Sequence, residues 1–358
     1  MKNGTGSEPI GAVVLGATGY VGGELLRLLT THPVFALEAA VSESRQGQPI
    51  AATFPNLAGA YAAERFAGHD DWISNIEPGS RVALFSAAPH GASAALVAAA
   101  LEASGKRNLD VHVVDASADF RYAAAADYAA IYGAEHGAPG LLGAFSCAVP
   151  EHAPDVRTPH VGHPGCFATA VLLATVPLVA SGLAEDEVFV TATTGSTGSG
   201  RSPQPGTHHP ERHGNLYAYK PLAHRHAPEI AGLTAAATGR SPRVHFVPQS
   251  GPFARGIYAT VHARAREPVT VDRLREFFEK TYAAHPFIDV VPGTPRLKHV
   301  VTSNRCEIGI ATDGEAIAVM SAIDNLVKGA AGGAVQWMNR LWDQPETAGL
   351  TAVAPAWT

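Results

Sequence analysis

Two short segments of this chain carry residue types whose spacing can support chemistry. Cys166 follows Pro164-Gly165 and opens an apolar, helix-forming stretch. Near the N-terminus, three glycines spaced three residues apart follow the apolar run Val13–Leu15. A glycine turn between a strand and a helix is typical of dinucleotide binding, and a cysteine at a helix start is a thiol with a lowered pKa. The pair therefore predicts a hydride carrier working beside a thiol nucleophile.

The glycine turn assigns a separate role to each of its glycines. Gly16 permits the tight turn, Gly19 lets the backbone approach a diphosphate, and Gly22 allows close packing of helix on strand. The diphosphate is then expected at the positive end of the helix that begins near Tyr20. The residues predicted to bind the cofactor in this turn are Gly16, Thr18, Gly19, Tyr20, Val21 and Gly22.

The residues after the second predicted strand bear on the choice between NAD and NADP. Ser42, Ser44 and Arg45 suit the 2′-phosphate of NADP, whereas Glu43 suits the free ribose hydroxyl of NAD. Two hydroxyls and a guanidinium outweigh one carboxylate, so NADP(H) is the expected cofactor. The alternative is that Arg45 is only a solvated loop residue.

The cysteine needs a group that manages protons. The field of the helix start favours the Cys166 thiolate, and the N–H groups there can stabilise an oxyanion on an acyl carbon. His224 and His226 flank an arginine just before an expected helix start and are the favoured acid/base candidates, while the cluster at 208–212 is the rival. Cys147 and Cys306 lack such surroundings and are expected to be small buried side chains.

Composition limits the class of protein. Of 358 residues, 46% are hydrophobic and 16% charged, with a net charge of −6, which disfavours a nucleic-acid or membrane surface. Three scattered cysteines give no disulfide framework and no Cys-x-x-Cys pair, so no metal site is predicted and a reduced, cytoplasmic compartment is expected. No signal-peptide pattern and no apolar run of membrane-spanning length is present in the sequence.

The order of elements predicts an α/β protein with two domains. Strands alternate with helices up to about residue 150, which indicates a doubly wound Rossmann-type parallel sheet. The later strands have short connections, which indicates a second α+β domain with a mixed, largely antiparallel sheet. The expected domains are 1–163 and 164–324, with the helical stretch 325–345 packing back onto the first. Residues 196–221 are expected to form a long functional loop. The predicted strands are Ala12–Leu15, Ala36–Val41, Val82–Ser86, Val111–Asp115, Glu187–Thr194, Arg243–Pro248, Gly256–Arg264 and Glu307–Thr312, and the predicted helices are Val21–Leu29, Ala92–Ala103, Cys166–Val179, Val271–Tyr282 and Asn325–Leu341.

Several motifs, in order along nearly the whole chain, resemble one known family. They are Gly16–Glu24, Asp115–Arg121, Pro164–Cys166, Thr194–Arg201, His224–Ile230, Arg255–Gly256 and Ala322–Ala331. Together they resemble N-acetyl-γ-glutamyl-phosphate reductase of arginine biosynthesis, in a superfamily that includes aspartate-semialdehyde dehydrogenase.

The resemblance implies reduction of an acyl phosphate by NADPH to an aldehyde, with loss of phosphate. It implies that Cys166 attacks the acyl carbon to give a thioester, that one of His224 and His226 is the acid/base, and that Asn325 lies near the nicotinamide. Charge-assisted donors are needed for a phosphate and a carboxylate. The residues expected to bind substrate are Arg121, Arg201, Lys220, Glu229 and Arg255.

Three other interpretations remain open from the sequence. The loop Thr207–Arg212 resembles the related reductase of lysine biosynthesis, whose aminoadipyl or glutamyl phosphate is joined to a small acidic carrier protein. A non-catalytic NADP-binding sensor on the same fold, or a thiol-independent hydroxy-acid dehydrogenase, would leave Cys166 unexplained. An exposed antiparallel sheet in the second domain favours a homodimer or homotetramer.

Overall fold

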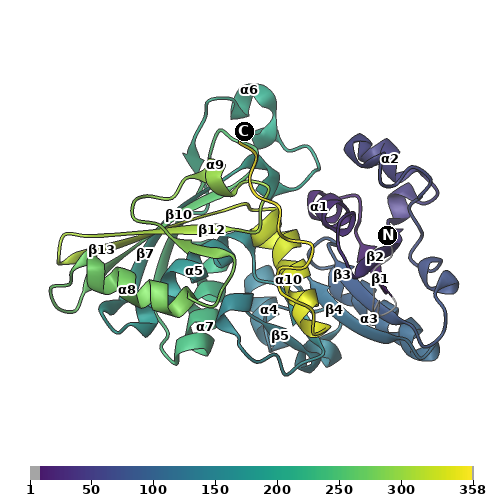
Figure 1. The fold of residues 1–358 in the computed structure, drawn as a ribbon, viewed down its shortest axis with the longest axis horizontal. Helices are drawn as coiled ribbons and strands as arrows, with labels where there is room; N and C mark the ends of the chain where they lie inside the picture. The colour runs from purple at the N-terminus through teal and green to yellow at the C-terminus, as the bar shows by residue number, and fades with distance from the viewer. Residues whose placement is uncertain (1–8, 357–358) are drawn as a thin grey trace, which may run out of the picture. The chain divides into compact units, whose positions relative to one another are not determined.

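A computed structural model describes residues 9–356, which form two compact units (Figure 1). Within the described residues, the first unit comprises the chain up to Ser146, Val156–His163 and Ala334–Leu350, and the second comprises Cys147–Asp155, Pro164–Gly333 and the chain from Thr351. The segment Cys147–Asp155, expected in the first domain, belongs to the second unit, where its Glu151 pairs with Lys328. The C-terminal helical stretch is divided at Ala334.

The first unit contains a six-stranded sheet in the order β2-β1-β3-β4-β6-β5. The β1–β2, β1–β3, β3–β4 and β4–β6 pairs are all parallel. Its strands are β1 (Ile10–Leu15), β2 (Phe35–Val41), β3 (Arg81–Ser86), β4 (Asp110–Asp115), β5 (Phe145–Cys147) and β6 (His160–Gly162). Its main helices are α1 (Tyr20–Leu29), α2 (Ile50–Thr53), α3 (Ser93–Lys106), α4 (Ala125–Tyr132) and, from Ala334 onward, α10 (Gly332–Leu341). The predicted doubly wound parallel sheet is confirmed.

Both faces of this sheet are covered. Val13 and Val14 are neighbours in β1 and point to opposite faces, yet both are completely buried. The same holds for Leu84 and Phe85 in β3. A strand buried on both faces explains why these segments are continuous apolar runs, the pattern expected of a parallel sheet flanked by helices.

The second unit contains a seven-stranded mixed sheet in the order β11-β12-β13-β10-β7-β9-β8. The β11–β12 and β7–β9 pairs are parallel, and the other four neighbouring pairs are antiparallel. Its strands are β7 (Ala184–Thr194), β8 (Tyr217–Ala218), β9 (Arg243–Ser250), β10 (Ile257–Ala265), β11 (Ile288–Val290), β12 (Cys306–Thr312) and β13 (Ala316–Ile323), and its helices are α5 (Cys166–Ala180), α6 (His209–Arg212), α7 (His226–Thr238), α8 (Val271–Tyr282), α9 (Leu297–Val300) and the π-helix η8 (Val327–Ala331).

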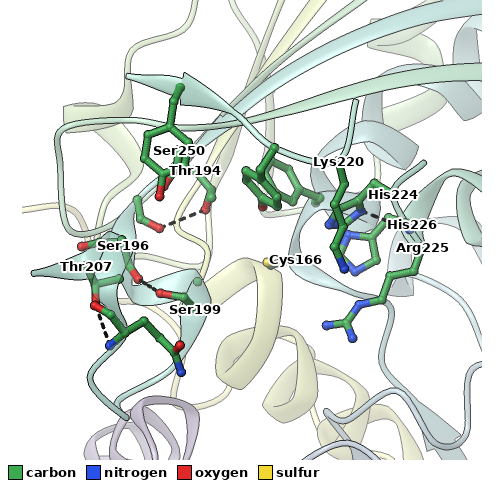
Figure 2. A pocket seen from close by; sticks show the side chains of 17 residues that line it. Cys166, Thr194, Ser196, Ser199, Thr207, Lys220, His224, Arg225, His226 and Ser250 are labelled. Atoms are coloured by element: carbon green, nitrogen blue, oxygen red, sulfur yellow. Dashed lines mark hydrogen bonds between the residues drawn. The ribbon is translucent and has the colours of Figure 1, made fainter. Parts of the chain in front are cut away.

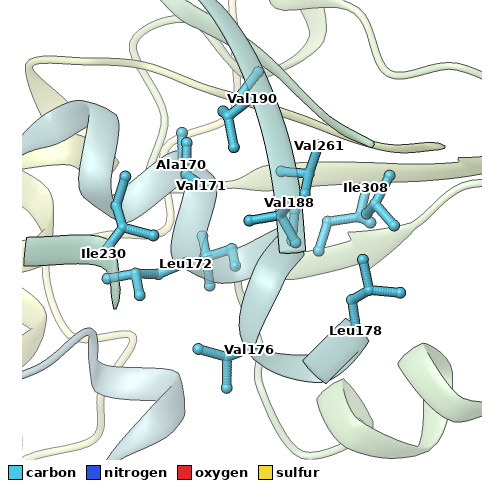
Figure 3. Close-up of a cluster of buried hydrophobic side chains, with 14 of the residues drawn as sticks. Ala170, Val171, Leu172, Val176, Leu178, Val188, Val190, Ile230, Val261 and Ile308 are labelled. Atoms are coloured by element: carbon cyan, nitrogen blue, oxygen red, sulfur yellow. The ribbon is translucent and has the colours of Figure 1, made fainter. Parts of the chain in front are cut away.

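Helix α5 is the centre of the second core. Every residue from Phe167 to Val179 is buried. Its Val171 and Leu172 lie among Val190 of β7 and Val261 of β10 (Figure 3). A helix that is apolar all round has no solvent face and is held on every side. The first residue of α5 is therefore attached to one of the most constrained elements of the unit.

Several elements differ from the sequence predictions. Among the predicted strands, none corresponds to the short strands β5, β6 and β11 or to β13. The stretch predicted as one helix over Asn325–Leu341 is the π-helix η8 followed by α10. The expected loop 196–221 contains short 3₁₀ turns, helix α6 and strand β8. Among the described residues, no helix has the length and apolar character required to cross a membrane.

Candidate active site

The glycine turn lies between β1 and α1. Gly16 has φ +70°, and a Cβ there would lie 2.6 Å from the backbone oxygen of Ala87. A Cβ on Gly22 would lie 2.7 Å from the backbone of Ala17. Both positions therefore require glycine, the first for its conformation and the second for packing of helix on turn. Gly19 is the N-cap of α1 and provides no side-chain cap, so the N–H groups of the first turn point out of the helix start.

The residues predicted to distinguish NADP from NAD follow β2. Ser42 is buried, and its Oγ lies 3.4 Å from Oγ1 of Thr18 in the glycine turn and 3.5 Å from Oγ of Ser44. Arg45 is exposed and donates a hydrogen bond to Oε1 of Gln48 at 3.0 Å. Ser42 is thus adjacent to the glycine turn and Ser44 to Ser42, while Arg45 lies in the short 3₁₀ helix η1 (Glu43–Arg45).

Cys166 is the first residue of α5, as the sequence predicts. Its N-cap is Gly165, in an extended conformation, and it gives no side-chain cap. The Gly165 N–H instead donates to Oε1 of Glu229 at 2.7 Å. The positive end of the helix dipole therefore acts on the Cys166 thiol, and a thiol in that field is favoured as the thiolate.

Cys166 opens into a cavity of about 450 Å³ within the second unit. Figure 2 shows its sulfur facing that space, with Lys220, His224, His226 and Arg225 on one side and the hydroxyl-bearing residues on the other. The lining consists of Cys166, Phe167, Thr194, Gly195, Ser196, Gly198, Ser199, Gln204, Gly206, Thr207, Tyr217, Tyr219, Lys220, His224, Arg225, His226 and Ser250. A volume of several hundred cubic ångströms with a few convergent polar groups is typical of a small-molecule site.

The two histidines differ in electrostatic state. Their ring centroids lie 4.7 Å apart. Burial, together with the charges of Arg225 and Lys220, lowers the pKa of His224 to about 4. The backbone N–H of His226 donates to Nδ1 of His224 at 3.2 Å, which places the proton of the neutral ring on Nε2. His224 is therefore a neutral hydrogen-bond donor near pH 7.

His226 has a carboxylate as its neighbour. Oε2 of Glu229 lies 3.9 Å from Nε2 of His226, one helical turn along α7. That distance is too long for a hydrogen bond but short enough for charge attraction between the carboxylate and an imidazolium. Since the other oxygen of Glu229 accepts the Gly165 N–H, one buried carboxylate links the start of α5 to the histidine.

Two further lining residues are not among the predicted site residues. Arg225 lies between the two histidines in sequence and brings a guanidinium to the cavity wall. Tyr219 is also in the wall, and burial together with the charge of the nearby Cys166 thiolate raises its pKa above the ordinary value. Its hydroxyl stays protonated as a donor. Arg225 is visible in the His-Arg-His motif, whereas the approach of Tyr219 depends on tertiary structure.

Several predicted substrate or cofactor ligands make contacts inside the protein. Arg121 is buried and donates to the backbone oxygens of His163 at 3.1 Å and Ala116 at 3.3 Å. Arg255 forms a two-fold contact with Asp324, at 3.0 and 3.2 Å. Arg201 is exposed, and none of these three arginines lines the cavity at Cys166.

Asn325, predicted near the nicotinamide, is also engaged. Its Oδ1 accepts the Gly256 N–H at 2.7 Å, and its Nδ2 donates to Oγ1 of Thr197 at 3.0 Å. The amide thus joins two loops beside the cavity.

The rival loop and the remaining cysteines have other surroundings. In the loop Thr207–Arg212, Thr207 lines the cavity, while His208 and His209 are exposed and are absent from the lining. Cys306 is completely buried, as predicted. Cys147 is only half-buried and lies in β5, at the edge of its sheet, so the prediction of a buried side chain is wrong there.

Comparison with known proteins places both units in one group. Residues 12–180 match the family "Semialdehyde dehydrogenase, NAD binding domain", and residues 166–325 match "Semialdehyde dehydrogenase, dimerisation domain". In fold the chain is similar to aspartate semialdehyde dehydrogenase II of Vibrio cholerae, with a TM-score of 0.69 at 19% identity over 94% of this chain and 99% of that one. It is also similar to the Candida albicans enzyme determined with NADP, with a TM-score of 0.63 at 16% identity over 96% and 99%.

Curated relatives are similar along nearly the whole chain. A Methanosarcina barkeri protein named N-acetyl-gamma-glutamyl-phosphate reductase is 38% identical over 349 residues, which is 97% of this chain and 99% of that protein. A Pseudomonas aeruginosa protein of the same name is 38% identical over 348 residues, 95% of this chain and 98% of that one.

Proposed function

Because the chain belongs to the N-acetyl-γ-glutamyl-phosphate reductase family of semialdehyde dehydrogenases, we propose that it reduces N-acetyl-γ-glutamyl phosphate with NADPH, releasing phosphate and N-acetylglutamate 5-semialdehyde for arginine biosynthesis. The observation that carries this proposal is Cys166, held at a helix start and opening into a cavity with two histidines and two cations.

The first unit fits an NADP(H) cofactor. A Cβ at Gly16 or Gly22 would collide with neighbouring backbone, so the turn stays tight. The uncapped start of α1 presents N–H groups suited to a diphosphate. Thr18 and Ser42 are close together at this point, with Ser44 and Arg45 next in the chain as candidate ligands of the 2′-phosphate. When bound, NADPH supplies the hydride that reduces the thioester carbon.

Cys166 acts as the nucleophile. Its thiolate attacks the acyl carbon, the C–O bond to phosphate breaks, and the phosphate leaves as a thioester forms on Sγ. After reduction, the C–S bond breaks and the thiolate is regenerated as the aldehyde leaves. The helix start that stabilises the thiolate also offers backbone N–H groups to the oxyanion at each step.

His226 is the acid/base. A base should have a pKa near the working pH, and a neighbouring carboxylate supports its protonated form. His224, with its pKa lowered to about 4, has little affinity for the thiol proton and instead donates Nε2–H to the substrate. Glu229 positions both His226 and the start of α5.

Lys220 and Arg225 form the anion subsite of the cavity. The phosphate of the substrate carries two negative charges, and a lysine and an arginine beside the nucleophile match them. Arg121 and Arg255 already bind protein acceptors, so they contribute less to the substrate than the sequence suggests. Hydroxyl and amide groups on the opposite wall suit the acetamido group and the α-carboxylate of the substrate. The residues that carry these groups are Thr194, Ser196, Ser199, Gln204 and Thr207.

The carrier-protein alternative is not favoured. The curated relatives described above are named for the acetylated small molecule, and His208 and His209 of the loop that suggested a carrier are outside the cavity lining. A non-catalytic sensor would have no use for a thiol beside two histidines.

A homo-oligomer through the open face of the second sheet completes the proposal. Phe189 of β7 is 53% exposed on that face and stacks on His245 of β9, with ring centroids 4.7 Å apart. An exposed aromatic on a strand is suited to a subunit contact, and the matching family is named for dimerisation. None of the three cysteines forms a disulfide among the described residues, which supports a reducing cytoplasmic compartment.

The reaction run in reverse tests substrate and reaction class together. With N-acetylglutamate 5-semialdehyde, phosphate and NADP⁺, we expect phosphate-dependent formation of NADPH. Aspartate semialdehyde, which lacks the acetamido group and one methylene, is the matched control and should react at least a hundredfold more slowly. Preference for aspartate semialdehyde, or turnover independent of phosphate, would overturn the proposal.

A further inference from the structure

We propose that the π-helix η8 (Val327–Ala331) is a positioning element for Cys166, seated on it through Gly329 and anchored by the buried Lys328–Glu151 ion pair. The inference rests on the nucleophile role proposed above for Cys166, and it concerns residues distant in sequence from that cysteine.

Gly329 brings the η8 backbone into contact with the nucleophile. A Cβ at Gly329 would lie 2.8 Å from Cβ and 3.1 Å from Cα of Cys166. A Cβ contact below 3.0 Å is essentially never found in proteins, so one of the two residues must move if any side chain is added at Gly329. Helix α5 is buried on every side beyond its first residue, and the movement therefore falls on Cys166 itself or on η8.

The geometry of η8 is unusual and is held from its beginning. The Gly329 N–H donates to the Asp324 backbone oxygen at 3.0 Å, and the Ala331 N–H donates to Leu326 at 2.9 Å, both five residues back. Such π-turns are rare in proteins, and those that occur are often found at functional sites. The Asp324 carboxylate accepts the N–H groups of Leu326 at 2.8 Å and Val327 at 2.9 Å, so the entry into η8 is fixed.

Arg255 strengthens that entry. Its guanidinium pairs with the same Asp324 carboxylate, which is completely buried. The Thr302 N–H donates to Oδ2 of Asp324 at 2.6 Å. A predicted substrate ligand thus acts here through the element that contacts the nucleophile.

The residue before Gly329 supplies the anchor. Nζ of Lys328 lies 2.5 Å from Oε1 of Glu151, and both side chains are completely buried. Nζ also lies 5.5 Å from the ring centroid of Phe287. A buried ion pair contributes little net stability compared with apolar residues of similar size, because both charges lose their hydration. What it provides is direction, since the contact of Lys328 with Glu151 forms with η8 in its observed place.

Gly329→Ala tests the seat, with Gly232→Ala as the matched control. Gly232 is an exposed helical glycine of α7, where an added Cβ meets nothing within 4 Å. The readouts are kcat, the KM for NADPH, and the pH dependence of Cys166 alkylation by iodoacetamide, followed by peptide mass mapping. For Gly329→Ala we expect at least a tenfold loss of kcat, a KM for NADPH within twofold, and an upward shift of the alkylation midpoint. If Gly329→Ala and Gly232→Ala have the same kcat, KM for NADPH and alkylation midpoint, Gly329 does not position Cys166 and the proposal is wrong.

The double variant Lys328→Met/Glu151→Met tests the role of the buried ion pair. It also tests the proposal if Gly329→Ala fails to fold. It replaces the ion pair by apolar groups of similar length, so we expect a Tm within a few degrees of wild type, together with the same loss of kcat and shift of the alkylation midpoint. Wild-type kcat and midpoint in the double variant would show that the pair only fills space. Alkylation needs neither substrate nor NADPH, so a wrong substrate assignment would abolish wild-type turnover yet leave this readout intact.

Discussion

Helices α1 and α5 begin in the same way and differ in what surrounds that beginning. Each follows a glycine N-cap with extended backbone and no side-chain cap. At α1, a Cβ on Gly19 would meet nothing closer than 3.7 Å, and Tyr20 is 37% exposed. At α5, the Gly165 N–H is taken by Glu229, and Gly329 is packed on Cys166.

The difference separates two uses of one electrostatic feature. The N–H groups and dipole of a helix start attract an anion wherever they occur. An open start such as that of α1 suits a ligand that binds and leaves in each cycle. An enclosed start such as that of α5 suits a covalent nucleophile, whose position must not vary. The predictions below treat the two starts as separable.

Cys166→Ser should have the largest effect. A serine hydroxyl is hardly ionised near pH 7 even in a helix-start field, so we expect turnover to become undetectable while the Kd for NADPH, measured by fluorescence titration, stays within threefold. Cys147→Ser is the control and should retain turnover. Turnover of Cys166→Ser within tenfold of wild type would rule out the covalent mechanism.

Separate replacement of the two histidines should show which of them transfers the proton at the enclosed start of α5. His226→Asn removes the acid/base, and we expect kcat to fall by about 10² to 10⁴ with little change in the substrate KM. His224, with a pKa of about 4, is neutral from pH 5 upward. His224→Asn should therefore leave the shape of the pH profile unchanged and act mainly by raising the substrate KM. The reverse pattern would assign the proton transfer to His224.

Gly16→Ala should affect the open start alone. It adds a left-handed backbone strain of about 1 kcal/mol and a collision with Ala87, so we expect the Kd for NADPH to rise at least tenfold. Gly133→Ala has the same φ of +70° but nothing within 4 Å, and it should cost stability without changing that Kd. The rate of Cys166 alkylation should not change in either variant. Equal Kd values in the two variants would remove Gly16 from the cofactor site.

Arg45→Ala should have the smallest effect and concerns only cofactor choice. Loss of a charged donor to the 2′-phosphate costs about 1.5 kcal/mol, so we expect the KM for NADPH to rise about tenfold and that for NADH to stay within twofold. Lys106→Ala, an exposed cation at the end of α3, is the control. Equal changes for both cofactors would show that Arg45 is a solvated surface residue.

The sequence predicts both helix starts because their signals are local. The glycine turn after the apolar run marks the end of β1 and the start of α1, and Pro164-Gly165 marks the start of α5 at Cys166. The mixed second sheet is likewise visible as strands with short connections. Strand β13 also has a local signal, the Asp313-Gly314 pair that precedes it, and in the structure Gly314 turns the chain there with φ +102°.

Other features depend on contacts between distant residues and could not be predicted. The charge of Arg255 is evident from its type, but its pairing with Asp324 depends on the fold. The same holds for the distinction between His224 and His226, which follows from the charges of Arg225 and Lys220 near the first ring and from Glu229 near the second. The π-helix resembles an ordinary helical stretch in sequence, and its hydrogen bonds to residues five positions back accompany tertiary contacts of Gly329 and Lys328 with Cys166 and Glu151.

Trapping of the acylated enzyme tests the central claim most directly. The protein is mixed with N-acetyl-γ-glutamyl phosphate in the absence of NADPH, quenched in acid, digested and analysed by mass spectrometry. We predict one N-acetylglutamyl group per chain, released by hydroxylamine, on the peptide that contains Cys166, with none on the Cys147 or Cys306 peptides. Acylation of another residue, or full turnover by enzyme that never acquires the Cys166 adduct, would contradict the account.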